Sequence, residues 1–142
     1  MEIARREFME RMAGMLAALA VPGCASVAAT RVASLDGAVR LPLADYPQLT
    51  REGGYLKVQP EGAASSIYVL AIEDRRFIAL SPICTHLGCT VGIEGEWLVC
   101  PCHGSTYDRI GRVVRGPAER SLRQFPLAVT PDGHLIIEIG QL

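Results

Sequence analysis

The chain has 142 residues, of which 49% are hydrophobic, and a formal net charge of −1 at pH 7. This length is typical of a single domain, and the near-zero charge excludes the strongly basic surface by which many proteins bind nucleic acids. Acidic and basic residues balance each other along the chain, and neither internal repeats nor low-complexity tracts indicate a solenoid or a disordered tail.

The N-terminal residues 1–29 differ in composition from the rest. The pair Arg5-Arg6 precedes an uncharged stretch over residues 12–29, a pattern that resembles a twin-arginine export signal. We therefore predict a helical targeting segment or membrane anchor. Eighteen helical residues would reach about 27 Å, slightly less than a hydrocarbon core of about 30 Å. Cleavage, retention as a transmembrane helix, and lipidation at Cys24 in "VPGC" all stay open.

Small and polar residues over 30–38 predict a flexible linker. The domain itself is predicted to span residues 39–142.

Alternating apolar and polar residues, broken by turn residues, predict short strands in this domain. The predicted strands are "YLKVQP", "SIYVLAI", "FIALS", "EWLVC", "PLAVT" and "HLIIEI". The polar turns "EDRR" (73–76) and "PDGH" (131–134) each predict an antiparallel hairpin. We predict an all-β fold, a small antiparallel sandwich or barrel, with His134 as a solvated turn residue.

Two short boxes concentrate the chain's metal-binding residues. "CTHLGC" (84–89) and "CPCHGS" (100–105) hold four of the five cysteines and two of the three histidines. Glu94-Gly95 is a plausible turn between "TVGI" and "EWLV", and a hairpin there would bring both boxes to one end of the sheet. Candidate metal ligands are Cys84, His86, Cys100 and His103. These four could hold zinc, but zinc would leave Cys89 and Cys102 without a role, and a disulfide framework alone needs no paired histidines.

The two boxes resemble box I and box II of the Rieske iron-sulfur proteins, and most closely those of the cytochrome bc and b6f complexes. The resemblance extends over residues 39–142 and includes "YDRIGRVVRGPA" (107–118), although the loop between the boxes is somewhat shorter than in most relatives. It implies one Rieske [2Fe-2S] cluster per chain, with one iron held by Cys84 and Cys100 and the other by His86 and His103.

The resemblance also assigns roles to residues around the cluster. It implies a disulfide between Cys89 and Cys102. Ser105 and Tyr107 would donate hydrogen bonds to a cluster sulfide and to a ligand thiolate. Leu87 would shield the cluster on one side and the segment 116–118 on the other.

The implied function is electron transfer from membrane quinol to a c-type cytochrome, in a complex with cytochrome b and without independent activity of the chain. His103 would hydrogen-bond the quinol and accept its proton, and His86 would lie beside it at the exposed tip. Export and the disulfide together predict a membrane-attached domain on the periplasmic side. Two alternatives stay open: a Rieske ferredoxin serving an oxygenase, and the small subunit of a periplasmic oxidoreductase of the arsenite oxidase kind.

Overall fold

The computed structural model describes residues 28–140. The predicted twin-arginine pair Arg5-Arg6 and the candidate lipidation site Cys24 lie outside the described residues. Between residues 28 and 140, no helix is long and apolar enough to cross a membrane.

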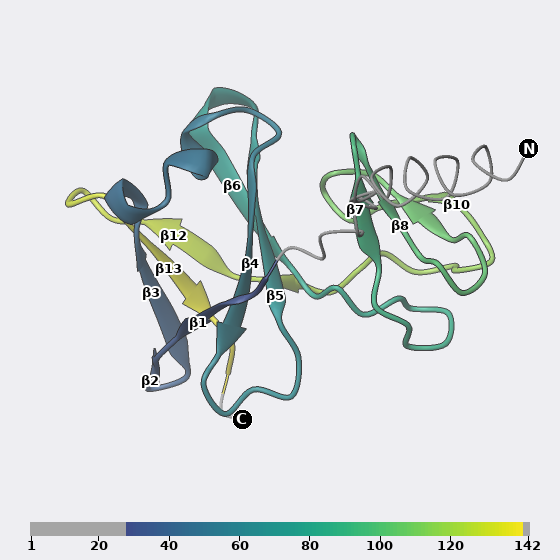
Figure 1. Cartoon of the computed structure of the whole chain (residues 1–142), viewed down its shortest axis with the longest axis horizontal. Helices are drawn as coiled ribbons and strands as arrows, with labels where there is room; N and C mark the ends of the chain where they lie inside the picture. The colour runs from purple at the N-terminus through teal and green to yellow at the C-terminus, as the bar shows by residue number, and fades with distance from the viewer. Residues whose placement is uncertain (1–27, 141–142) are drawn as a thin grey trace, which may run out of the picture.

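The described chain is built from short strands in three sheets (Figure 1). The first sheet has the order β1-β4-β5-β6-β11, formed by Thr30–Val32, Tyr55–Pro60, Ile67–Ile72, Arg76–Leu80 and Gln124–Phe125. The second has the order β12-β13-β3-β2, formed by Leu127–Val129, His134–Glu138, Ala38–Pro42 and Ser34–Leu35. The third has the order β10-β9-β8-β7, formed by Val113–Arg115, Thr106–Tyr107, Trp97–Val99 and Gly92–Glu94. Three 3₁₀ turns, η1 to η3, lie at Leu43–Asp45, Pro47–Thr50 and Glu73–Arg75. This architecture confirms the all-β prediction.

Strand β5 separates two hydrophobic cores, which explains why its sequence "IYVLAI" is apolar almost throughout. Alternate side chains of a strand point to opposite faces. Ile67 and Val69 therefore pack in the core shared with the second sheet, whereas Tyr68 and Leu70 pack in a separate core on the other face. Each fully buried aliphatic side chain contributes about 1.5–3 kcal/mol to folding.

This second core joins the first sheet to the third. Leu70 and Leu80 contribute from β5 and β6, and Leu98 and Tyr107 contribute from β8 and β9. All four side chains are fully buried. Figure 1 shows β7, β8 and β10 as a separate lobe beside the two larger sheets. The lobe that carries both boxes is thus anchored by apolar packing.

The predicted hairpins are confirmed. Strands β5 and β6 pair antiparallel around η3, β12 pairs antiparallel with β13, and β7 pairs antiparallel with β8 around Glu94 and Gly95. Alternating burial on β4 and β13 follows the alternation in their sequences.

The segment 30–38, which we predicted to be a flexible linker, contains β1 and β2. Strand β1 pairs in parallel with β4, and β2 pairs antiparallel with β3. Small polar residues lack an apolar pattern, but their backbone groups still complete the edges of two sheets, and this pairing was not readable from composition. In addition, the Ser34 hydroxyl donates to the Glu61 carbonyl at 3.0 Å.

Candidate metal centre

The two boxes form loops with the same backbone hydrogen bonds. In both Cys84–Cys89 and Cys100–Ser105, the N–H of the first residue donates to the carbonyl of the sixth at 2.8 Å. The N–H of the fifth residue donates to the carbonyl of the first, at 3.0 Å in the first loop and 2.9 Å in the second. That fifth residue is Gly88 or Gly104, with φ of +80° and +75°, a conformation that side chains disfavour. The matching glycines therefore give the two boxes matching turns.

The loops are fixed to the sheets beneath them. The buried Tyr68 on β5 donates from its hydroxyl to the Val91 carbonyl at 2.8 Å, just after the first box. Burial, followed by the nearby Tyr55, raises the pKa of Tyr68, so the phenol keeps the proton that it donates. The β7–β8 hairpin then carries the chain from one box to the other.

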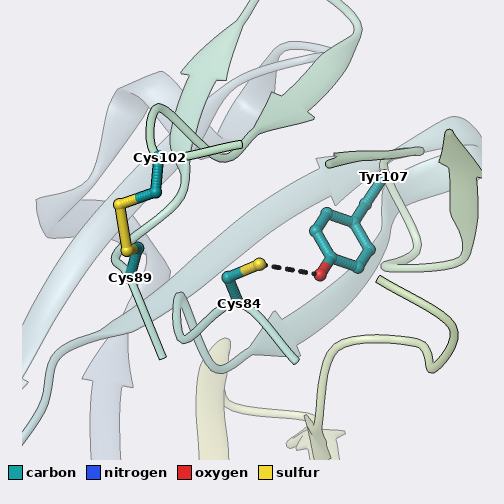
Figure 2. The surroundings of a disulfide bond; sticks show 4 residues. All are labelled: Cys84, Cys89, Cys102 and Tyr107. Atoms are coloured by element: carbon teal, nitrogen blue, oxygen red, sulfur yellow. Dashed lines mark hydrogen bonds between the residues drawn. A yellow bond between two sulfur atoms is a disulfide. The ribbon is translucent and has the colours of Figure 1, made fainter. Parts of the chain in front are cut away.

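A disulfide between Cys89 and Cys102 joins the two loops (Figure 2). The Cα atoms of the two residues are 6.5 Å apart. It confirms the pairing implied by the resemblance. Among the described residues, Cys84 and Cys100 are the free cysteines, and both are buried. The disulfide leaves these two thiols available as ligands.

The two histidines of the boxes lie side by side at the surface. The ring centroids of His86 and His103 are 5.0 Å apart and the rings meet edge to face, at an interplanar angle of 89°. Both residues are exposed, and the neighbouring Leu87 is 68% exposed. The loops therefore present two imidazoles outward and two thiols inward.

Tyr107 lies against one of these thiols. Its hydroxyl oxygen is 3.2 Å from Cys84 Sγ, and Figure 2 marks this contact with a dashed line. Burial raises the pKa of the Cys84 thiol, but hydrogen bonds with Tyr107, the His86 backbone, Cys100 and Ser105 outweigh it and leave this pKa below its usual value. Burial and the contact with Cys84 raise the pKa of Tyr107. At this distance the Tyr107 hydroxyl can donate to the sulfur of Cys84 when that sulfur is a thiolate.

Ser105 is fully buried behind the second loop. Its Oγ accepts the Ala118 N–H at 3.0 Å, which leaves the hydroxyl proton of Ser105 for another acceptor. Ala118 is itself 4% exposed and belongs to the segment 116–118 that we predicted to cover the site. This segment contacts the site through Ser105.

A second group of sulfurs could be mistaken for a metal site. The Sγ atoms of Cys89, Cys100 and Cys102 lie within 4.8 Å of one another. Two of them are joined in the disulfide and cannot bind a metal as thiolates. The group shows instead that the disulfide lies close to Cys100.

The remaining donors fit a two-iron cluster of the Rieske kind. Each loop carries one free thiol and one imidazole, so together they supply the two sulfur and two nitrogen ligands that such a cluster requires.

The sequence did not indicate one residue that contacts this site, Thr85. It also placed His134, which lies outside the site, in a turn. Thr85, whose hydroxyl and backbone N–H both contact Tyr107, carried no signal beyond its position in "CTHLGC". The predicted turn residue His134 instead begins β13, with its side chain 25% exposed and its Nδ1 3.0 Å from Asp132 Oδ2.

A model of the Rieske [2Fe-2S] domain family matches residues 40–126. The chain is 45% identical over 73 residues to the cytochrome b6-f complex iron-sulfur subunit of Synechococcus elongatus, covering 49% of this chain and 41% of that protein. It is 52% identical over 69 residues to the subunit of the same name from Trichodesmium erythraeum, covering 44% of this chain and 38% of that protein. The matches thus span less than half the length of these two relatives.

Solved structures show the same fold. The plasma membrane Rieske protein PetC3 from Synechocystis PCC 6803 superposes with a TM-score of 0.55 at 28% identity, covering 65% of this chain and 92% of that one. A chain from the complex of reduced oxygenase and oxidised ferredoxin in carbazole 1,9a-dioxygenase also gives a TM-score of 0.55. The sequences are 19% identical, and the match covers 76% of this chain and 99% of that one. That second likeness concerns the fold alone.

Proposed function

Because the chain belongs to the Rieske [2Fe-2S] domain family, we propose that Cys84 and Cys100 bind one iron of its [2Fe-2S] cluster and that His86 and His103 bind the other. The observation that carries this assignment is the pairing of the two imidazoles, 5.0 Å apart, on loops that also hold two buried free thiols. The disulfide between Cys89 and Cys102 holds these loops together.

The bound cluster supplies one-electron transfer at a high potential, because two neutral imidazoles replace two thiolates and remove two negative charges. The buried hydroxyls of Tyr107 and Ser105 act in the same direction. A donor near a ligand sulfur or a sulfide stabilises the extra negative charge that reduction brings. Both residues therefore raise the potential.

The electron donor is a membrane quinol that binds at the tip formed by His86 and His103. Both rings are exposed and lie edge to face, so His103 has a ring nitrogen free to hydrogen-bond the quinol hydroxyl and accept its proton. The exposed Leu87 beside them offers an apolar contact at the tip and shields the cluster from water.

The chain acts as the iron-sulfur subunit of a cytochrome bc-type complex, with cytochrome b and a c-type cytochrome as partners. The names of the relatives from Synechococcus elongatus and Trichodesmium erythraeum support this role. The disulfide favours an oxidising compartment, which supports a membrane-attached domain on the exported, periplasmic side.

Purification of the tagged full chain from membranes in mild detergent tests this assignment. We expect cytochrome b and a c-type cytochrome to co-purify, because electron transfer from quinol through the exposed tip needs both partners. Recovery with a molybdenum enzyme, or with a soluble oxygenase, would contradict the proposal and support one of the two alternative functions.

A further inference from the structure

The Tyr107 hydroxyl has three polar neighbours but only one proton to donate. Its oxygen lies 3.2 Å from Cys84 Sγ, 3.2 Å from the Thr85 backbone nitrogen and 3.1 Å from Thr85 Oγ1. The Thr85 N–H donates to the phenol oxygen and occupies one of its lone pairs. A phenol has a single O–H. Cys84 Sγ and Thr85 Oγ1 are therefore two candidate acceptors for one proton.

A third residue fixes the role of the Thr85 hydroxyl. Thr85 Oγ1 lies 2.6 Å from the Arg120 carbonyl, and a carbonyl oxygen only accepts. The single hydroxyl proton of Thr85 is therefore committed to Arg120. What Thr85 Oγ1 presents to Tyr107 is a lone pair, so it can accept the Tyr107 proton but cannot donate to the phenol oxygen.

We infer that Thr85 competes with Cys84 for the Tyr107 proton and thereby holds the redox potential below the value that Tyr107 alone would give. This inference rests on the proposed function, in which Cys84 is a cluster ligand. Thr85 acts through Tyr107 and is a positioning residue. The Arg120 carbonyl takes part from a segment 35 residues further along the chain, because it orients the Thr85 hydroxyl.

The Thr85→Val variant of the cluster-loaded full chain tests the inference. Valine keeps the β-branched shape and the backbone N–H but removes the competing oxygen, so the Tyr107 proton is left to Cys84 alone. We expect the midpoint potential to rise. A rise of up to tenfold in the reduction equilibrium corresponds to about 59 mV for a one-electron couple. The matched control Thr85→Ser keeps the hydroxyl and should have the same midpoint potential as the wild type.

Two further backgrounds separate this mechanism from a general disturbance of the loop. With Tyr107→Phe already present, Thr85→Val should leave the potential unchanged, because there is no proton to redirect. With Ser105→Ala present, Thr85→Val should raise the potential as it does in the wild type, since the neighbours of the Tyr107 hydroxyl named above do not include Ser105. If Thr85→Val does not load the cluster, Thr85→Ala is measured in the same three backgrounds with the same expected results.

An unchanged or lowered potential in Thr85→Val would overturn the inference, and so would an equal rise in the Tyr107→Phe background. These results differ from failure of the proposed function, which would appear as the absence of a Rieske-type electron paramagnetic resonance spectrum in the wild-type chain itself.

Discussion

Replacing any one of the four proposed ligands is expected to abolish the [2Fe-2S] cluster. Cys84→Ser and Cys100→Ser each remove a buried thiol, and His86→Ala and His103→Ala each remove one of the paired imidazoles. In each variant, one of the two irons would keep one protein ligand where it needs two, so we expect less than about a tenth of the wild-type iron content. Iron and sulfide analysis, with the visible absorption spectrum of the purified protein, measures the loss.

The chain supplies a matched control for this experiment. His134 is its third histidine and lies on β13, in the second sheet, outside the two loops. His134→Ala should retain the full cluster content. Full iron content in any of the four ligand variants would contradict the assignment of that residue, and loss of iron in His134→Ala would show that iron content follows folding and not ligation.

The second large effect concerns the disulfide. Cys89 and Cys102 are 13 residues apart in sequence, and closing a loop of this size stabilises the folded state by about 3 kcal/mol in the chain-entropy estimate. The Cys89→Ala/Cys102→Ala double variant should therefore melt roughly 10–20 °C lower than the wild type. Because neither sulfur is a proposed ligand, we expect it to load the cluster; calorimetry and iron analysis test the two expectations separately.

Single variants show whether the cross-link itself causes this loss. Cys89→Ala and Cys102→Ala each break the same bond, so each should lower the melting temperature about as much as the double variant does. Losses that add up across the two positions would indicate packing contributions and would count against the cross-link as the source. Loss of the cluster from the double variant would contradict the expectation that ligand binding does not depend on the cross-link.

Local features of the fold were readable from the sequence because they depend on neighbouring residues. Alternation in "YLKVQP" and "HLIIEI" predicted β4 and β13, and the polar turns after β5 and β12 predicted their hairpins. The division into three sheets was not readable. It depends on pairings between distant segments, such as β11 with β6 and β13 with β3, for which apolar alternation carries no register.

The candidate metal centre could also be predicted only in part from the sequence. The spacing of cysteines and histidines in the two boxes was sufficient to name candidate ligands, and resemblance to a known family added the disulfide. The contacts of Thr85 were invisible, because the Arg120 carbonyl that orients its hydroxyl belongs to a backbone group and has no side-chain signature. Resemblance assigned Tyr107 as a donor, but the two acceptors that share its proton follow only from the distances.

The central claim is that this chain holds a high-potential Rieske cluster tuned for quinol oxidation. Redox titration of the cluster-loaded full chain at neutral pH, followed by electron paramagnetic resonance, tests it most directly. With two imidazole ligands and hydroxyl donors from Tyr107 and Ser105, we expect a midpoint potential of about +100 to +300 mV, in the upper part of the Rieske range. A potential near −150 mV, the lower end of that range, would contradict quinol oxidation, and one near about −400 mV, typical of all-cysteine plant ferredoxins, would contradict the histidine ligands themselves.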